Sequence, residues 1–282
     1  MRESTAPAAP NVVAFQATLL GLGLASTGGL GQIVTGSRNE IWQCHAYDQH
    51  GQGVMLYLKL GLSTRAMLVE ALAAQVASAI GLRSPQPYLC QVHSHHVGKP
   101  KGQRFLAFAS AAAGERGLAR PLRNLDSLLS ILSASKVVDL ACVFDEWIGN
   151  DVRSPSDILI CPEHGPIFID HEAALPHGAD PAVALTNWLA GRLLEGLDVA
   201  ARRQLLERLR RRCAALHRLR LDEAPGVLAV VQGGGALYAE LVLFLRQRLE
   251  HLDRLLSERT MPEQRYLETL PNVPSETPNA AV

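Results

Sequence analysis

Hydrophobic and polar positions alternate in short runs near the start of the chain. The runs 39–48 (NEIWQCHAYD) and 54–60 (VMLYLKL) carry aromatic, β-branched and alternating apolar residues, and the polar segment QHGQG separates them. This pattern predicts a β-hairpin. Residues 87–110 predict two further strands around a turn rich in glycine, lysine and proline. The glycine-rich stretch 12–34 predicts a strand or short helix followed by a loop.

A helical period follows the first hairpin. Residues 63–82 are rich in alanine and leucine, begin at a Ser/Thr cap and stop at Gly81, which is typical of a helix. The same period predicts a helix over 125–149. It also predicts helices over 187–258, with breaks near Pro225 and at three consecutive glycines.

The order of these elements predicts an α+β fold with two lobes. A β-rich N-lobe with one helix, residues 12–110, precedes a mainly α-helical C-lobe, residues 111–260, which contains a short hairpin over 157–170. This layout is typical of a protein-kinase-like fold. The ends, 1–11 and 261–282, offer little apolar material for a core, and we expect them to be disordered.

Composition narrows the function classes. The 282 residues include 27 Lys+Arg and 27 Asp+Glu, so the formal net charge is zero, which excludes binding of nucleic acid or anionic membranes by bulk charge. Hydrophobic residues make up 48% of the chain, enough for a core. Five scattered cysteines without a CxxC pair suggest neither a zinc site nor a disulfide framework and favour a cytoplasmic location. The uncharged stretch 12–34 holds five glycines, so we expect no membrane span.

Four residues have the chemistry of a phosphoryl-transfer site. Lys59 ends the run 54–60, where its ammonium could contact nucleotide phosphates, and Glu70 in the next helix could pair with it. Asp157 and Asp170 flank the short hairpin, where their oxygens could bind a hard cation such as Mg²⁺. The alternative is structural for each: an exposed strand-end lysine, a solvent-facing helix glutamate, a turn cap and a strand-end acid.

The stretch 144–175 (FDEWIGNDVRSPSDILICPEHGPIFIDHEAAL) resembles the catalytic region of HipA-like kinases, relatives of the protein kinases and phosphatidylinositol kinases. That family typically carries FDxxIxNxDRxxxNxL, a short hairpin and IDHxxAx. The Lys59 strand and residues 71–89 resemble its VxK and NExLAxxLAxxLGLPxPE segments. The resemblance runs from about 36 to 175, half the chain. It implies a kinase that binds ATP and Mg²⁺ and transfers the γ-phosphate to a protein Ser or Thr.

The resemblance also implies roles for the matched residues. Lys59 would contact the α- and β-phosphates, and Glu70 would orient Lys59. Asp170 would bind the metal, and Asp157 stands where the family has a metal-binding Asn. Arg153 would tie the catalytic loop together by ion pairing.

Two further positions are implied for the nucleotide itself. Gly36 and Ser37, just before Arg38, stand where a turn would cover the nucleotide. Ala109, in the run 104–110, would belong to a hinge strand whose backbone forms hydrogen bonds to adenine.

The catalytic base departs from the family pattern. The family's aspartate directly precedes the arginine, but here Val152 precedes Arg153 and Asp151 lies one residue earlier. Neighbouring Cα atoms are about 3.8 Å apart, so Asp151 could act only after a local rearrangement, and valine cannot accept a proton. Two outcomes stay open, an active kinase that uses Asp151 and a slow or inactive pseudokinase.

A second hypothesis is a non-catalytic module that senses nucleotide or binds a protein or nucleic-acid partner. The segment 201–220 carries eight arginines and one acid. Its apolar stripe consists of Leu205, Leu209, Cys213 and Leu216. Because no aromatic residues are interleaved with the arginines, we favour a solvated amphipathic helix over a nucleic-acid surface.

Two other patterns are weaker. His93, His95 and His96 could bind a metal, but no cysteine or carboxylate completes the set, and we favour a solvated turn. The run 31–38 (GQIVTGSR) lacks both the lysine and the following helix of a phosphate loop.

Overall fold

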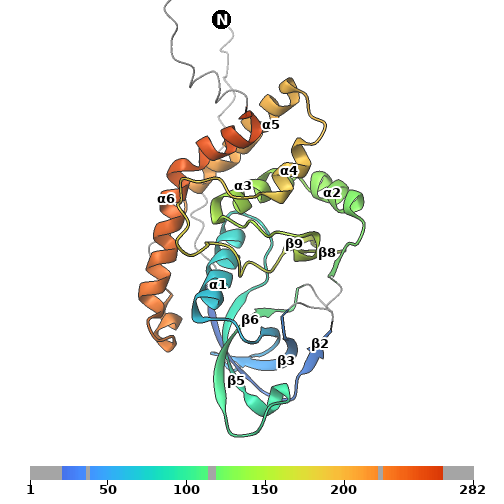
Figure 1. The fold of residues 1–282 in the computed structure, drawn as a ribbon. Coiled ribbons are helices and arrows are strands. Elements are labelled where there is room, and N and C mark those ends of the chain that lie inside the picture. Colours follow the sequence, from blue (N-terminus) through green and yellow to red (C-terminus); the bar gives the residue numbers. More distant parts are fainter. Residues whose placement is uncertain (1–20, 36–38, 114–118, 222–224, 263–282) are drawn as a thin grey trace, which may run out of the picture.

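The N-terminal part of the chain forms a six-stranded sheet (Figure 1). The computed structural model describes residues 21–35, 39–113, 119–221 and 225–262. The strands are β1 (Gly23–Thr27), β2 (Gln32–Val34), β3 (Ile41–Asp48), β4 (Gly53–Lys59), β5 (Pro87–His93) and β6 (Arg104–Ala111). Their order is β1-β5-β6-β4-β3-β2, and β1 also pairs with β3. Five of the strands therefore form a closed ring of pairings.

The hairpin predicted over 39–48 and 54–60 is confirmed as β3 and β4, which pair in register from Ile41–Lys59 to Tyr47–Gly53. Small and branched side chains pack between the strands of the ring. They are Ala25, Cys44, Ala46, Leu56, Leu58, Leu60, Cys90, Val92, Val97, Ala107 and Ala109. Such small side chains suit the narrow interior of a closed sheet, which must be filled at high packing density.

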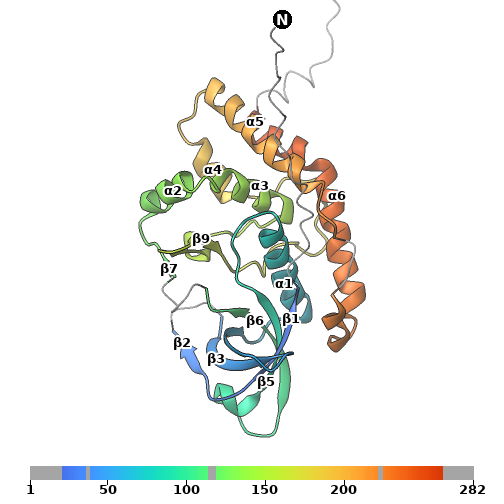
Figure 2. The same cartoon turned by 180° about the vertical axis from the view of Figure 1, so that it is seen from behind.

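Helix α1 (Thr64–Ala79) confirms the helix predicted over 63–82. The Ser63 hydroxyl accepts a hydrogen bond from the backbone N–H of Ala66 at 3.1 Å, which caps the helix start. Gly81 takes a φ of +91° just after the helix end, a conformation that glycine adopts without strain. The helix contacts β5 and β6 and also α6 (Gly234–Thr260), so it is buried on more than one face (Figure 2).

The single helix predicted over 125–149 is wrong in one respect, because the structure breaks it in two. Helices α2 (Leu125–Ala134) and α3 (Val138–Ile148) meet at a bend of 104°. Lys136 takes a left-handed φ of +58° between them, which a right-handed helix cannot continue through. The bend directs α3 into the interior, where all of its residues except Asp139 are buried.

The remaining helices follow the predicted pattern over 187–258. They are α4 (Trp188–Leu194), α5 (Val199–Leu216) and α6, with the 3₁₀ turn η4 (Gly226–Val230) before α6. The predicted apolar stripe of α5 is buried. Two of its arginines form ion pairs with neighbouring helices, Arg208 with Asp139 and Arg210 with Asp253. These ion pairs agree with the predicted amphipathic helix, because part of its charged face contacts other helices of the same chain.

A second, three-stranded sheet lies between the large sheet and the helices (Figure 1). Its order is β7 (Arg120–Pro121), β8 (Ile158–Cys161) and β9 (Gly165–Phe168). The last two strands confirm the hairpin predicted over 157–170. The short turns η1 (Ser94–Val97) and η3 (Pro155–Asp157) complete the described elements.

The mixture of sheets and helices confirms the predicted α+β class. The main core extends from α1 through the other helices, so α1 shares a core with the C-terminal half. The division into two lobes at residue 110 therefore stays a prediction. Most of the ends expected to be disordered lie outside the described residues, but Met261 is buried in the main core, so the ordered part extends beyond the predicted boundary.

Within the described part of the chain, no single helix is long and apolar enough to cross a membrane. Helices α2 and α3 reach the required length and apolar character only when taken together, across their 104° bend.

Candidate functional site

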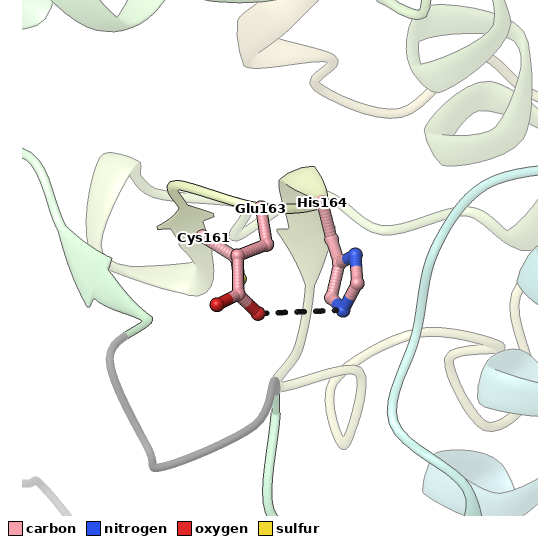
Figure 3. A group of neighbouring side chains, drawn as sticks. All are labelled: Cys161, Glu163 and His164. Carbon is pink, nitrogen blue, oxygen red and sulfur yellow. Dashed lines mark ion pairs between the residues drawn. The ribbon is translucent and has the colours of Figure 1, made fainter.

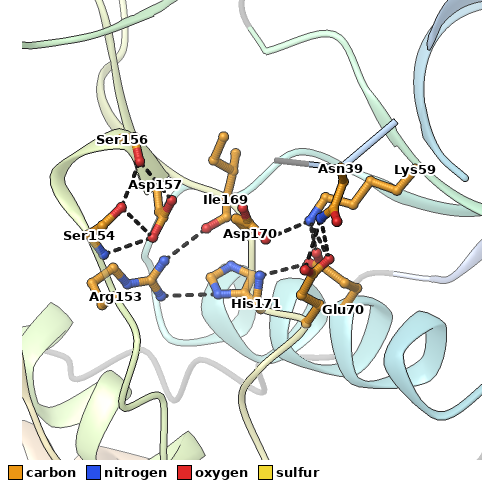
Figure 4. A network of polar contacts seen from close by, with 11 residues as sticks. Asn39, Lys59, Glu70, Arg153, Ser154, Ser156, Asp157, Ile169, Asp170 and His171 are labelled. Atoms are coloured by element: carbon orange, nitrogen blue, oxygen red, sulfur yellow. Dashed lines mark hydrogen bonds and ion pairs between the residues drawn. The ribbon is translucent and has the colours of Figure 1, made fainter. Parts of the chain in front are cut away.

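Lys59 lies at the centre of a group of carboxylates (Figure 4). It ends β4, and its Nζ forms ion pairs with Glu70 of α1, with Asp170 Oδ1 at 2.7 Å and with Glu172 Oε2 at 3.3 Å. Two of these partners, Glu70 in α1 and Asp170 after β9, are 100 positions apart in the chain. One ammonium faces three carboxylates, so this cluster carries an excess of negative charge.

Burial shapes the charges of Lys59 and Glu70. Burial disfavours the ammonium, but the charges of Glu70 and Asp170 outweigh that effect and hold the pKa of Lys59 above its usual range. Burial raises the pKa of Glu70, and the charge of Lys59 counteracts part of that rise. The second oxygen of Glu70 accepts a hydrogen bond from the backbone N–H of His171 at 2.9 Å. Glu70 therefore joins the strand lysine to the segment after β9.

Asp170 has an unusual backbone. Its φ is +61°, in the left-handed region that non-glycine residues rarely enter. Such strained positions concentrate at functional sites, because the surrounding structure must hold them in place. Its side chain is 39% exposed, so a ligand from solvent can reach the carboxylate that Lys59 also contacts.

Glu172 and Asn39 belong to the cluster although no prediction named them. The Asn39 side-chain amide donates to both oxygens of Glu172, at 2.9 and 2.8 Å. Glu172 lies only two positions after Asp170, so its closeness in sequence to a predicted metal-binding acid was a usable signal. Asn39 gave none, because it meets Glu172 across 133 residues of sequence.

Arg153 is a buried tie between α3 and the segment after β9. Its guanidinium forms an ion pair with Asp145 at 2.8 Å and donates to the backbone oxygen of Ile169 at 2.8 Å. It also lies 3.1 Å from Nδ1 of His171. Because arginine can only donate, that nitrogen accepts, and the imidazole carries its proton on Nε2. Burial, with the charges of Arg153 and Lys59, lowers the pKa of His171 well below its usual range.

Asp157 lies beside Asp170 at the base of the β8–β9 hairpin, and its backbone oxygen accepts from Ile169 N–H at 2.9 Å. Its Oδ2 accepts from the backbone N–H and hydroxyl of Ser154, at 2.7 and 2.9 Å. The structural alternative, a carboxylate that caps a turn, is thus present. Burial raises the pKa of Asp157, and the charge of Asp170 raises it further. The two carboxylates therefore repel each other.

The loop residues near the expected base are on the surface. Asp151 and Val152 are both exposed in the turn that follows α3, and the valine is 52% exposed. Arg153 instead points inward. The structure thus brings Arg153 and the acids at 157 and 170 into one network, and it leaves Asp151 outside the contacts drawn in Figure 4.

The pairing of β6 contradicts the role predicted for Ala109. It was predicted to offer backbone hydrogen bonds to adenine, but β6 lies between β4 and β5, and Ala109 pairs with Leu58 on one side and Tyr88 on the other. Its exposed fraction is 0%, so a ligand cannot reach it. The predicted nucleotide-covering turn, Gly36 and Ser37, lies outside the described residues.

A cavity of about 430 Å³ lies elsewhere. Its walls are the loop after α1, the end of β6 and the turn of the β8–β9 hairpin. It contains none of Lys59, Glu70 or Asp170. We place the candidate chemistry at the ion cluster, because that is where charged groups converge, and regard the cavity as a separate feature.

Comparisons with known proteins give likenesses among solved structures. No protein-family model matches the chain, and no curated protein matches it. A solved structure of the proinflammatory kinase CtkA from Helicobacter pylori is similar at 11% sequence identity, with 84% of this chain and 97% of that chain covered and a TM-score of 0.47.

Proposed function

We propose that this chain is a kinase-like phosphotransferase that binds ATP and Mg²⁺ and, when active, passes the γ-phosphate to a protein Ser or Thr. The observation that carries the proposal is the junction of Lys59 with Glu70 and Asp170. It joins a strand ammonium, a helix carboxylate and a solvent-accessible carboxylate, which are the groups that phosphoryl transfer needs. The motifs over 144–175, which are similar to those of HipA-like kinases, support the same function.

The role of Lys59 is to meet the α- and β-phosphates, held in place by Glu70. The cluster is already rich in negative charge, so a triphosphate needs additional positive charge to bind there. Glu172 would have to release Lys59 or turn away as the phosphates arrive. Binding of nucleotide should therefore depend strongly on a divalent cation.

The carboxylates of Asp157 and Asp170 fit Mg²⁺. Oxygen donors from one or two carboxylates, completed by substrate phosphates, are the usual protein site for this ion. Burial, and to a smaller extent the charge of Asp170, raises the pKa of Asp157, and a divalent cation held by the two acids would relieve their repulsion. When bound, Mg²⁺ would neutralise phosphate charge. Arg153 contributes indirectly, because it holds the backbone at Ile169 next to Asp170.

The transfer step itself conserves atoms and charge. The acceptor hydroxyl oxygen attacks the γ-phosphorus, and the bond from that phosphorus to the bridging oxygen breaks. ADP leaves with the electron pair, and the hydroxyl proton passes to a carboxylate. Asp151 is the candidate acceptor of that proton, after the exposed turn rearranges.

A non-catalytic nucleotide-sensing module is the second candidate. It is favoured by Val152, which stands at the position of the base. It is also favoured by the ion pairs that Lys59 already forms with three carboxylates. Such a module would bind ATP–Mg²⁺ and an unknown protein partner without turnover. The two candidates share the site and differ only in the transfer step.

The test is a phosphorylation assay with radiolabelled ATP, Mg²⁺ and a general protein acceptor, paired with a binding titration of a fluorescent ATP analogue. An active kinase labels itself or the acceptor, and the label disappears in Asp170→Asn but persists in Asp126→Asn, which removes an exposed acid on α2. Mg²⁺-dependent binding without label favours the module. No binding with or without Mg²⁺ overturns both candidates.

A further inference from the structure

The turn of the β8–β9 hairpin gathers three side chains that can bind a transition metal (Figure 3). Cys161 ends β8, and Glu163 and His164 lie in the turn. One ligand atom from each lies within 4.8 Å of the other two. The three residues are apart from the Lys59 cluster, and the phosphotransferase proposal gives them no role.

The geometry is close to that of a bound ion. Glu163 Oε2 and His164 Nε2 are 3.9 Å apart. Zinc lies about 2.0–2.3 Å from nitrogen, oxygen and sulfur ligands, so tetrahedral ligands are separated by roughly 3.3–3.8 Å. Small rotations of the exposed Glu163 and His164 side chains toward the buried Cys161 would close that difference. The turn itself is fixed by the β8–β9 pairing of Cys161 with Gly165.

The donor set selects the kind of metal. A thiolate and an imidazole are soft or borderline ligands that suit zinc and its analogue cobalt, whereas Mg²⁺ prefers oxygen alone. The carboxylate of Glu163 would balance part of the ion's charge. We propose that Cys161, Glu163 and His164 bind one Zn²⁺-type ion at this turn, with a fourth coordination position left for water or another ligand.

The surroundings leave room for that fourth ligand. His164 also lines the cavity of about 430 Å³, together with Arg83 and Gln86 of the loop after α1. A three-residue zinc site with an open position beside a cavity is the arrangement found where zinc binds exchangeable ligands. The ion would also fasten the hairpin whose other end carries Asp157 and Asp170. Metal at the turn would therefore stabilise the fold.

Two other groups could compete for metal. The carboxylates of Glu70, Asp170 and Glu172 also lie within 4.8 Å of one another, but the ammonium of Lys59 occupies their centre. The rings of His93, His95 and His96 lie 4.2–6.0 Å apart. Among these groups of described residues, the hairpin turn is the one that combines a cysteine with a histidine and a carboxylate, so a thiolate signal distinguishes it.

The test titrates the reduced, metal-free full-length protein with Co²⁺ and follows the thiolate-to-cobalt charge-transfer absorbance, with Zn²⁺ added as competitor. We expect one Co²⁺ per chain, a thiolate band, displacement by Zn²⁺ and a higher melting temperature with Zn²⁺. Cys161→Ser should lose the band. Glu163→Gln and His164→Gln should weaken binding about tenfold or more, because even outer-shell changes at metal sites cost that much.

The control is His95→Gln, which alters the competing histidine group and should bind Co²⁺ as the wild type does. Glu163 and His164 are exposed side chains, so their variants fold even if the buried Cys161→Ser does not. The proposal is overturned if the wild type gives no thiolate band in excess Co²⁺, if the band survives in a folded Cys161→Ser, or if His95→Gln abolishes binding while His164→Gln retains it. None of these results depends on nucleotide binding.

Discussion

Lys59 Nζ lies 2.7 Å from Asp170 Oδ1, although 111 residues separate the two in the chain. The same ammonium pairs with Glu70, whose carboxylate is buried and also accepts a hydrogen bond from His171. A strand end, a helix and a loop are thereby joined through one cation. Removing that cation should affect both the fold and the proposed nucleotide site.

Lys59→Met should lower the free energy of unfolding by about 3–5 kcal/mol, because it leaves Glu70 buried without its partner. Lys59→Met combined with Glu70→Leu should lose less than the sum of the single variants, since the unpaired charge is gone. Urea denaturation measures each value. The control is Lys101→Met, at an exposed turn, which should be nearly neutral. Additive losses in the double variant would contradict a coupled pair.

Glu172→Gln should strengthen binding of an ATP analogue in the presence of Mg²⁺. It removes a negative charge that competes with the phosphates for Lys59, while the amide oxygen can still accept from Asn39. Because Glu172 is partly exposed, we expect a gain of about fivefold, equivalent to roughly 1 kcal/mol. Glu195→Gln, at a distant exposed pair, serves as the control. Weaker binding in Glu172→Gln would show that Glu172 helps to hold the nucleotide.

Val152→Asp should raise phosphoryl transfer by about a hundredfold or more, the usual contribution of a positioned general base. It places a carboxylate at the position where the similar motif of HipA-like kinases has one, next to the buried Arg153. The Val152→Asn variant carries a side chain of the same size as aspartate that cannot act as a base, so its rate of phosphoryl transfer should stay near that of the wild type. The rate of label transfer from radiolabelled ATP is the measurement. If Val152→Asp is no faster and Asp151→Asn abolishes transfer, the displaced aspartate is the working base.

Glu146→Ala should destabilise the protein by about 3–5 kcal/mol. Glu146 is buried in α3 and pairs with Arg248 at 3.4 Å and Arg259 at 2.7 Å, so its loss leaves two guanidiniums without their carboxylate. Glu207→Ala breaks an exposed pair with Arg210 and should change stability by less than about 1 kcal/mol. Thermal and urea unfolding of both variants provide the comparison. Equal effects would mean that the α3–α6 pairs contribute no more than surface pairs.

His171 should make the fold sensitive to acid. Burial, reinforced by Arg153 and Lys59, lowers the pKa of the folded imidazole well below its usual range, whereas the unfolded imidazole has a pKa of about 6.5. Below that pH the unfolded chain binds a proton that the folded chain does not. Stability from this residue is therefore complete above about pH 6.5 and falls as the pH drops, by up to about 1.4 kcal/mol per unit.

The measurement is urea unfolding of the wild type and His171→Asn at neutral and mildly acidic pH. The asparagine oxygen can still accept from Arg153, but it does not titrate. The wild type should lose more stability on acidification than the variant, whose other acids and bases are unchanged. Parallel losses in the two proteins would show that His171 is not the source.

The elements that were predicted correctly depend on neighbours in sequence. The β3–β4 hairpin follows from alternation around a polar turn, and α1 follows from its helical period and the Ser63 cap. The break after Ala134 was missed, because the apolar spacing continues across it. The left-handed residue there is Lys136, and not the glycine or asparagine that would mark such a position in the sequence. Ala109 was assigned to a hinge because a strand that leads out of a sheet resembles, in sequence, one enclosed within it.

The sequence by itself determined the β3–β4 and β8–β9 hairpins, most of the helices, the α+β class and the separate candidates Lys59, Glu70, Arg153 and Asp170, since periodicity and motifs are properties of local sequence. Only the tertiary structure decided that Glu172 and Asn39 join the Lys59 cluster and that Glu146 pairs with Arg248 and Arg259. Ion pairing and metal ligation depend on distances in space, and packing of the strand, helix and loops sets those distances.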